Sequence, residues 1–250
     1  MLRPMTMPLT LITGASRGLG RAVAEQALAQ GHQVIGLSRR PPADLSSPRF
    51  LHWAVELADA RAAAAQLAAW LAEQGPRPWS SATLINNAGV VSRPAPLADS
   101  DADDLANAIR VGLEAPLLLS AAFLHATRGW PLPRKLLLVS SGLGRRPMAG
   151  SVSYCAAKAG LDHLARALAL EEAARPDGAR VVSLAPGVID TDMQQQLRGA
   201  DPQAFPERTR FAELHAGGQL DSPAAAAAKL MRYLERADFG GNPVADVRDA

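Results

Sequence analysis

The sequence predicts a single α/β domain of the Rossmann type, a doubly wound parallel sheet with helices on both faces. Short apolar runs alternate with longer Ala-rich stretches of helical composition. A glycine-rich segment lies between the first apolar run and the first helical stretch. The 250 residues suit one such domain, and no long linker or repeat divides them. We therefore treat residues 1–250 as one dinucleotide-binding and catalytic domain.

The expected elements follow in chain order and alternate between strand and helix. Alternation of this kind implies right-handed βαβ units and hence a parallel sheet. Ser222 is the expected N-cap of the last helix, and the third helix is long enough to contain a break. Strands are expected at 9–13, 33–37, 50–55, 82–85, 135–139 and 181–184, and helices at 18–30, 60–73, 101–126, 152–174 and 223–236.

One long polar segment does not fit the alternation. Residues 187–219 are Gln-rich and lie between the last expected strand and the last helix. Long insertions at this place often form a lid over a site, and we expect a substrate lid at about 188–219. A pair of surface helices is the alternative, and both interpretations can hold together.

Composition excludes several classes of function. Hydrophobic residues make up 48% and charged residues 20%, with a net charge of +2 and no block of like charge, so no nucleic-acid partner is expected. The single cysteine, Cys155, cannot form an internal disulfide, which fits a reducing cytoplasm. The five histidines show no metal-ligand spacing. Met1–Pro8 lacks a signal-peptide pattern, and no run approaches the roughly 18 consecutive apolar residues of a membrane span.

The glycine-rich segment, residues 13–20, has the sequence Thr-Gly-Ala-Ser-Arg-Gly-Leu-Gly. Glycine permits positive φ and lets backbone N–H groups approach a pyrophosphate closely. The following helix N-terminus adds a partial positive charge. A tight turn without a ligand is the alternative. Its position between a strand and a helix, at the first βα turn, favours phosphate binding.

The spacing Thr-Gly-x-x-x-Gly-x-Gly resembles the fingerprint of the short-chain dehydrogenase/reductase family. The resemblance extends along nearly the whole chain and implies that the segment binds a nicotinamide cofactor. The implied contacts are Gly14, Ser16, Arg17, Gly18, Leu19 and Gly20.

The end of the second strand indicates which nicotinamide cofactor is used. NAD-binding proteins usually place an acidic residue here to hold the ribose 2′-hydroxyl, but this chain has Ser38 followed by Arg39. A hydroxyl and a guanidinium favour a 2′-phosphate, and Arg17 can supply a second cation. Basic residues at these two places are typical of NADP-dependent family members. We therefore expect NADP(H); the alternative is that Arg39 and Arg40 are merely solvated.

Three further stretches match cofactor contacts of the family. Glu56 stands where an aspartate usually contacts the adenine. Residues 86–89 match the Asn-Asn-Ala-Gly motif, and residues 186–191 match a Pro-Gly motif whose threonine, here Thr191, binds the nicotinamide carboxamide. The resemblance thus implies contacts from Glu56, Leu57, Asn87, Ala88, Gly89, Pro186, Gly187, Val188, Ile189 and Thr191.

Tyr154 and Lys158 are the expected catalytic pair. They lie four positions apart on one helix face, so the lysine ammonium is expected to favour the tyrosinate and lower the tyrosine pKa from about 10. Ser141 follows the fifth strand at the sheet edge where ligands of such folds bind. By resemblance Ser141 is the third catalytic residue, because it precedes Tyr154 by the family's usual interval, and Lys158 also binds the nicotinamide ribose. Ser140 is the weaker candidate.

One position departs from the family pattern. Many members have an asparagine in the helix after Asn-Asn-Ala-Gly, where it supports a water-linked proton relay, and the matching residue here is Gly112. Its backbone carbonyl is retained, so we expect activity to survive in reduced form. The departure also leaves open an NADP-binding regulatory protein with little or no turnover.

Residues 84–90, 185–194, 210–211 and 217–220 resemble the sepiapterin-reductase-like branch, most closely the bacterial benzil reductases. This implies NADPH-dependent reduction of a small-molecule carbonyl, an aromatic or vicinal diketone such as benzil, to the hydroxy ketone. A sepiapterin-like or other alcohol/ketone oxidoreductase is the alternative. Family helices matching 101–126 and 152–174 pair in homodimers or homotetramers. The expected substrate wall, for which lid packing is the alternative, consists of Leu143, Met148, Ala149 and Met193.

Overall fold

A computed structural model describes residues 6–249 and contains one seven-stranded sheet. The strand order is β3-β2-β1-β4-β5-β6-β7, and every neighbouring pair is parallel. Met1–Met5 and Ala250 lie outside the described residues, as does most of the segment for which no signal peptide is expected. The strands are β1 (Met7–Thr13), β2 (Gln33–Ser38), β3 (Phe50–Ala54), β4 (Trp79–Asn86), β5 (Arg134–Val139), β6 (Arg180–Ala185) and β7 (Val244–Asp246).

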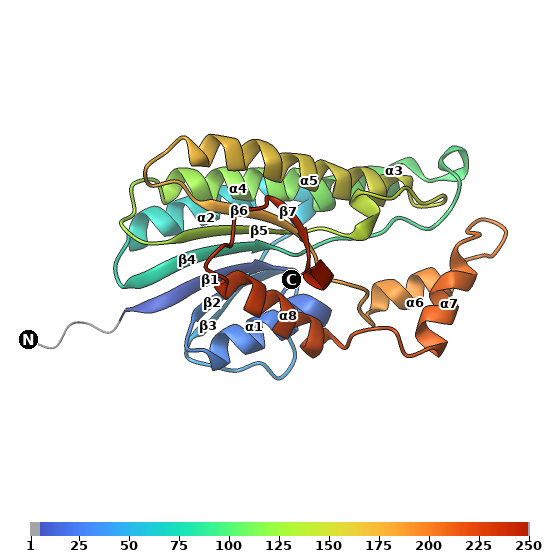
Figure 1. The fold of residues 1–250 in the computed structure, drawn as a ribbon, viewed down its shortest axis with the longest axis horizontal. Coiled ribbons are helices and arrows are strands. Elements are labelled where there is room, and N and C mark those ends of the chain that lie inside the picture. The colour runs from blue at the N-terminus through green and yellow to red at the C-terminus, as the bar shows by residue number, and fades with distance from the viewer. Residues whose placement is uncertain (1–5, 250) are drawn as a thin grey trace, which may run out of the picture.

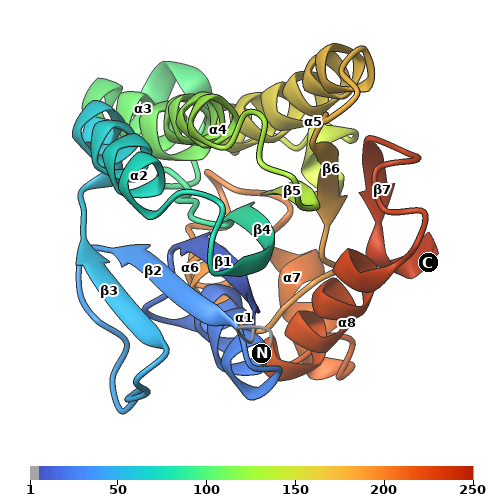
Figure 2. The same cartoon turned by 90° about the vertical axis from the view of Figure 1, so that its left-hand side faces the viewer.

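Helices cover both faces of the sheet, as the predicted fold class requires (Figure 2). One face carries α2 (Ala60–Gln74), α4 (Ala115–Ala126) and α5 (Val152–Ala173), with α3 (Ala102–Ile109) leading into α4. The other carries α1 (Gly18–Ala29) and α8 (Pro223–Glu235). The Ser222 side chain accepts a hydrogen bond from the Ala225 N–H, which confirms the expected N-cap of α8.

Alternate residues of each strand enter two separate cores. On β5, Leu136 and Leu138 pack beneath α2, α4 and α5, whereas Leu137 and Val139 pack against α1 and α8. Successive strand side chains point to opposite faces, so a strand covered on both sides is apolar throughout. This explains why the central strands are continuous apolar runs in the sequence.

The structure contains one strand more than expected. This seventh strand, β7, pairs with β6 in the register Ser183↔Val244; three residues carry too short a pattern to be recognised. The break considered for the helix at 101–126 is present as a π-helical segment, Arg110–Glu114, between α3 and α4. π-Helical turns widen the backbone hydrogen-bonding pattern and occur often at functional sites.

The stretch Ala102–Ala126 is long and apolar enough to span a membrane by length and composition. Its most apolar 18-residue window has a mean hydropathy of 1.3, and 44% of that window is buried inside the protein. Val111, Leu119 and Phe123 belong to the core beneath α2, α4 and α5. This stretch therefore packs as a core helix of the domain.

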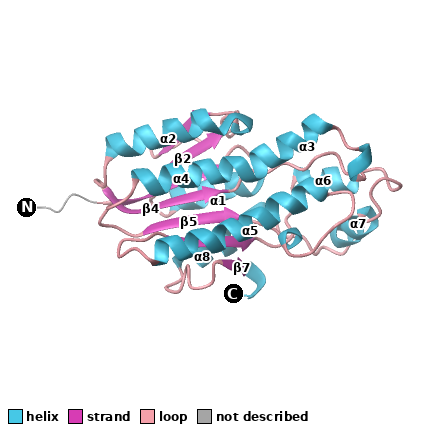
Figure 3. Ribbon diagram, turned by 90° about the horizontal axis from the view of Figure 1, so that it is seen from above, coloured by secondary structure: helices cyan, strands magenta, loops and turns pink. Residues whose placement is uncertain are grey.

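Two short helices, α6 (Asp192–Arg198) and α7 (Arg208–Ala216), project beyond the carboxyl ends of the strands (Figures 1 and 3). They confirm the pair of surface helices expected between 187 and 219. A parallel bridge joins Ile189 to Asp221, so the two ends of the segment meet. The segment packs through a small apolar cluster of Met148, Leu197, Phe205 and Phe211, which we call the α6–α7 cluster.

Candidate active site

The candidate site lies at the carboxyl ends of the central strands. β1 pairs with β2 on one side and β4 on the other, so the strand order reverses between β1 and β4. Ligands of doubly wound sheets bind in the crevice at such a reversal. The glycine loop follows β1, the Asn-Asn-Ala-Gly segment follows β4, and Ser141 follows β5. Residues far apart in the chain are thus brought to one edge of the sheet.

The glycine loop has the backbone shape of a phosphate cradle. Gly14 and Gly18 have φ of 72° and 55°, the left-handed region that favours glycine. A Cβ on Gly20 would collide with the Gly14 carbonyl oxygen. No side chain caps the N-terminus of α1, and its first turn has no acidic residue. The first N–H groups of a twelve-residue helix therefore lack side-chain acceptors, which suits a dinucleotide pyrophosphate.

Thr13 joins the glycine loop to the Asn-Asn-Ala-Gly segment. Its hydroxyl accepts hydrogen bonds of 2.9 Å from the N–H groups of Asn87 and Ala88. The Asn87 side chain donates to the Thr13 carbonyl at 2.9 Å. Asn86 instead turns into the core and donates to the Ser120 hydroxyl. The two asparagines of the motif therefore have separate roles. Asn87 joins the segment to the end of β1, and Asn86 anchors it to the core.

Ser38, Arg39 and Arg17, the residues expected to contact a 2′-phosphate, have different environments. Ser38 is only 5% exposed, and its hydroxyl donates to the Arg40 carbonyl at 2.8 Å and contacts His52 Nε2 at 3.1 Å. The Ser38 hydroxyl therefore already donates its proton to a carbonyl of its own turn. Arg39 is exposed. Arg17 pairs with Asp192 of α6 at 2.5 Å, and both side chains are largely exposed.

The expected adenine contact and the Pro-Gly segment are held by local bonds. The Glu56 carboxylate accepts from the Ala58 N–H at 3.0 Å and caps a short 3₁₀ turn, whereas Leu57 is buried in the core. Gly187 has φ of 87°. The Val188 carbonyl accepts from the Asp221 N–H, and Ile189 is buried.

Thr191 is the residue preceding α6, and it is half-buried beside the glycine loop. An ideal Cβ on Gly18 would lie 3.5 Å from its Cγ2 atom. The structure therefore brings the predicted carboxamide contact next to the predicted phosphate cradle, although 173 positions separate Thr191 from Gly18 in the chain.

Ser141, Tyr154 and Lys158 come together as expected. The Lys158 Nζ atom lies over the Tyr154 ring, 5.4 Å from its centroid, and donates to the Val139 carbonyl at 2.6 Å. The Ser141 side chain lies close enough to Tyr154 to lower the pKa of its phenol. Ser140 faces elsewhere, because its hydroxyl is 3% exposed and donates to the Lys158 carbonyl at 3.4 Å. The geometry therefore favours Ser141 over Ser140 as the site serine.

The expected direction of the Tyr154 pKa is wrong for this structure. Burial of the phenol raises the pKa of Tyr154 to about 12, against the lowering effect of the Ser141 hydrogen bond. Burial also lowers the pKa of Lys158 to about 8, against the raising effect of the Asp162 charge. Desolvation disfavours the charged form of both groups and here outweighs the opposing effects of Ser141 on Tyr154 and of Asp162 on Lys158. At neutral pH, Tyr154 is a neutral phenol that can donate a proton.

Gly112 lies in the π-helical segment and faces α5. A Cβ added at Gly112 would lie 3.1 Å from the Cβ of Ala157, the residue before Lys158. The departure from the family asparagine therefore occurs directly beside the catalytic helix, where the two helices pack closely.

The four residues expected to form the substrate wall divide into two groups. Met148 is buried in the α6–α7 cluster and Leu143 packs against it, which matches the packing alternative for both. Ala149 is exposed and Met193 is half-buried on α6. The four residues therefore differ in burial and do not form one continuous wall.

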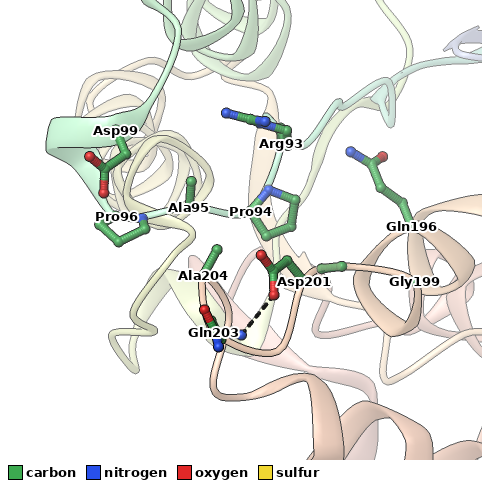
Figure 4. Close-up of a pocket in the computed structure, with 11 residues that line it drawn as sticks. Arg93, Pro94, Ala95, Pro96, Asp99, Gln196, Gly199, Asp201, Gln203 and Ala204 are labelled. Carbon is green, nitrogen blue, oxygen red and sulfur yellow. Dashed lines mark hydrogen bonds between the residues drawn. The ribbon is translucent and has the colours of Figure 1, made fainter.

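A cavity of about 630 Å³ opens between the loop after β4 and the end of α6 (Figure 4). None of Ser141, Tyr154 or Lys158 lines it. Ser92, next to this cavity's edge, hydrogen-bonds Ser153 at 2.8 Å, beside Tyr154. The lining residues are Arg93, Pro94, Ala95, Pro96, Asp99, Gln196, Gly199, Ala200, Asp201, Gln203 and Ala204.

Comparison with known families agrees with this geometry. Residues 8–202 match the short chain dehydrogenase family. The chain belongs to this family. As a short-chain dehydrogenase it is an oxidoreductase, and the family binds a nicotinamide cofactor. The matched range includes the glycine loop, the Asn-Asn-Ala-Gly segment, the three catalytic candidates and Thr191.

Individual relatives of this short-chain dehydrogenase span nearly its whole length. Benzil reductase ((S)-benzoin forming) of Bacillus subtilis is 33% identical over 97% of this chain and 99% of its own. Sepiapterin reductase of Rattus norvegicus is 33% identical over 96% of this chain and 95% of its own. A solved short-chain dehydrogenase/reductase from Burkholderia vietnamiensis is 35% identical, with a TM-score of 0.64 over 97% of this chain and 99% of its own.

Two contacts of this short-chain dehydrogenase were missed by sequence reasoning. Asp192 lies within the segment expected to form a lid, at about 188–219, and it pairs with Arg17 across 175 positions, a separation at which no local pattern exists. Asp162 is buried next to Lys158 on α5. The spacing of four between Lys158 and Asp162 on one predicted helix was the available signal.

Proposed function

We propose that this enzyme is an NADPH-dependent carbonyl reductase that reduces a ketone, with benzil-like aromatic or vicinal diketones as the substrate class. The observation that carries the proposal is the meeting of Ser141, Tyr154 and Lys158 beside the glycine cradle, with Tyr154 in its proton-donating form. The similarity to benzil reductase of Bacillus subtilis and to sepiapterin reductase of Rattus norvegicus supports reduction of a carbonyl.

Ser141, Tyr154 and Lys158 each have a separate role in the proposed reduction. Ser141 donates a hydrogen bond to the substrate carbonyl oxygen and holds it near the Tyr154 hydroxyl. Tyr154 donates its proton to that oxygen as the carbonyl becomes an alcohol. The Lys158 ammonium then stabilises the negative charge left on Tyr154. When bound, the reduced nicotinamide supplies the hydride that the carbonyl carbon receives.

The residues that would hold the cofactor lie in three segments. The backbone of residues 14–20 would hold the pyrophosphate, and Asn87–Gly89 would line the crevice. Lys158 would hold the nicotinamide ribose and Thr191 the carboxamide. The preference for NADPH is supported by the exposed Arg39 and by Arg17, which would have to exchange Asp192 for a phosphate. With the Ser38 hydroxyl already bonded, these two guanidinium groups provide the charge.

Assembly as a homodimer or homotetramer belongs to the same proposal. Leu117 of α4 and Val152 and Leu170 of α5 are large apolar side chains that are 45% or more exposed. They lie on the two helices that the family resemblance implies pair between subunits, where a second copy of the chain would cover them. A cytoplasmic location is also proposed, because the single cysteine, Cys155, is a free thiol.

The proposal is tested by following the oxidation of NADPH and NADH at 340 nm with benzil, other diketones, sepiapterin and simple ketones. We expect turnover of benzil with NADPH and much weaker turnover with NADH. Tight NADPH binding with no turnover of any carbonyl would instead support the regulatory alternative. Preference for sepiapterin over benzil would assign the enzyme to the pterin substrates.

A further inference from the structure

We infer that Asp162 is a positioning residue for the proposed reductase: its buried carboxylate, fixed by Ser183 and Arg145, keeps Lys158 in the ammonium form beside Tyr154. The inference rests on the proposed function, because it assigns Asp162 a part in the same reaction. It adds to the site a carboxylate that contacts neither substrate nor cofactor and acts through the lysine.

Asp162 lies one helical turn beyond Lys158 on α5, and both side chains are removed from solvent. Lys158 is 4% exposed and Asp162 is 2% exposed. Residues four apart on a helix project from the same face. Water screens their mutual attraction poorly at this depth. The pair therefore combines an ammonium and a carboxylate inside the protein, next to the reacting phenol.

Two donors hold the carboxylate in place. The Ser183 hydroxyl, on β6, donates to Oδ1 at 2.7 Å. The Arg145 Nε donates to Oδ2 at 3.0 Å. A buried carboxylate is costly unless its oxygens are hydrogen-bonded, and here both oxygens have a partner. The two hydrogen bonds therefore fix the position of the Asp162 carboxylate beside the Ser141 loop.

Arg145 connects this carboxylate to the Ser141 loop. It lies just after the 3₁₀ turn Gly142–Gly144 and donates a second bond to the Ala245 carbonyl of β7 at 2.9 Å. A Cβ on Gly144 would lie 2.9 Å from the Lys158 carbonyl oxygen and 3.1 Å from Asp162 Oδ2. The loop thus rests directly on the helical turn between Lys158 and Asp162. The same contacts position both Ser141 and Lys158.

The carboxylate charge opposes the effect of burial on the lysine. Burial lowers the pKa of Lys158 to about 8, and the negative charge of Asp162 raises it. The Tyr154 phenol on the other side of Lys158 is neutral because its pKa lies near 12. Without Asp162, the pKa of Lys158 would therefore fall further, and a smaller fraction of Lys158 would be in the ammonium form at a given pH.

Other charged groups on elements packed against α5 do not replace Asp162. Asp246 of β7 is paired with Arg248 at 2.6 Å. Arg110 and Glu114 lie on the π-helical segment, Arg110 exposed and Glu114 half-buried. A guanidinium such as that of Arg145 cannot take this role, because a cation lowers the pKa of a neighbouring ammonium. Asp162 is the group whose charge raises the pKa of Lys158.

The composition of the chain allows a direct measurement. The sequence has three lysines, Lys135, Lys158 and Lys229, so side-chain ¹³C labelling of lysine gives three NMR signals. The Lys135→Arg and Lys229→Arg variants assign two of them and hence the third. The titration of Lys158 can then be followed in the intact protein without any substrate.

The first test compares wild type with Asp162→Asn, which keeps the shape and an acceptor but removes the charge. We expect the Lys158 titration midpoint to fall by about one pH unit. The alkaline limb of kcat for NADPH-dependent benzil reduction is expected to fall by the same amount. Glu171→Gln, an exposed charge removal on the same helix, is the matched control and should move neither. An unchanged midpoint in a folded Asp162→Asn protein would overturn the inference.

The second test uses Arg145→Gln and predicts the opposite sign. Removing this cation leaves the Asp162 charge less compensated, so the Lys158 midpoint should rise by about 0.5 pH unit. Loosening of the packing around α5 would not give opposite shifts in the two variants. If Asp162→Asn does not fold, Arg145→Gln, with its side chain one-third exposed, decides the inference alone. A fall in the midpoint of Arg145→Gln would contradict it.

The two readouts separate this inference from the proposed function. A protein that reduces no carbonyl but shows both NMR shifts refutes the carbonyl-reductase proposal and retains the control of Lys158 by Asp162. Normal benzil reduction with no NMR shift in either variant would support the carbonyl-reductase proposal and refute the control of Lys158 by Asp162.

Discussion

The Nζ atom of Lys158 lies over the aromatic ring of Tyr154, 5.4 Å from the ring centroid. The ammonium is therefore close enough to stabilise a tyrosinate formed during reaction, while burial keeps the phenol protonated before it. This relationship favours proton donation by Tyr154, the direction that carbonyl reduction requires.

Tyr154→Phe removes the donated proton and keeps the ring beneath Lys158. We expect kcat for benzil reduction to fall about 100- to 10,000-fold, the usual contribution of a general acid. NADPH affinity, measured by fluorescence titration, should change little because the substitution removes only a hydroxyl. Retention of most of the activity would assign the proton donor elsewhere.

The two neighbouring serines form a matched pair for testing carbonyl orientation. Ser141→Ala should lower kcat about 100-fold, since it removes a donor to the reacting oxygen. Ser140→Ala should leave kcat nearly unchanged and lower the free energy of unfolding by about 1 kcal/mol, because its buried hydroxyl bonds the Lys158 carbonyl. Steady-state kinetics and urea unfolding measure the two effects. The reverse pattern would make Ser140 the catalytic serine.

Arg39 and Arg40 test the choice of cofactor. Arg39→Ala should weaken NADPH binding about 10- to 100-fold, the effect of losing a charge-assisted contact, and leave NADH binding unchanged. Arg40→Ala is the neighbouring control and should have a much smaller effect. Fluorescence titrations at low and high salt check this, because the Arg39 contribution should weaken as salt rises. Equal losses for NADPH and NADH would contradict the 2′-phosphate role.

Gly112→Asn tests the departure from the family relay. The asparagine should raise kcat, by about 10-fold if the relay limits turnover, because it restores the family's side chain beside Lys158. Gly112→Ala introduces the same close contact with Ala157 but no amide, so it controls for packing. The comparison is made on kcat at saturating NADPH. Equal kcat for the two variants would show that the backbone at residue 112 is sufficient.

Much of the fold and site follows from local sequence patterns. The inner strands β1, β2, β4, β5 and β6 and the major helices could be predicted because strands buried on both faces are continuous apolar runs and their covering helices are Ala-rich. The glycine loop, Asn87, Ser141, Tyr154 and Lys158 could be predicted because each motif lies where a strand ends or a helix begins. β7 could not be predicted, because its three residues become a strand only by pairing with β6.

Tertiary structure decided the electrostatics and the partners of the site. Sequence spacing placed Lys158 beside Tyr154, but the sign of the tyrosine pKa shift depends on burial, which spacing does not report. The Ser38 hydroxyl, read from sequence as a phosphate contact, is used within its own turn. The pairing of Arg17 with Asp192 and of Arg145 with Asp162 joins segments that meet only in the folded chain. Sequence by itself therefore determined which residues reach the sheet edge, whereas folding determined their charge states and contacts, because desolvation and long-range pairing arise only once the chain is packed.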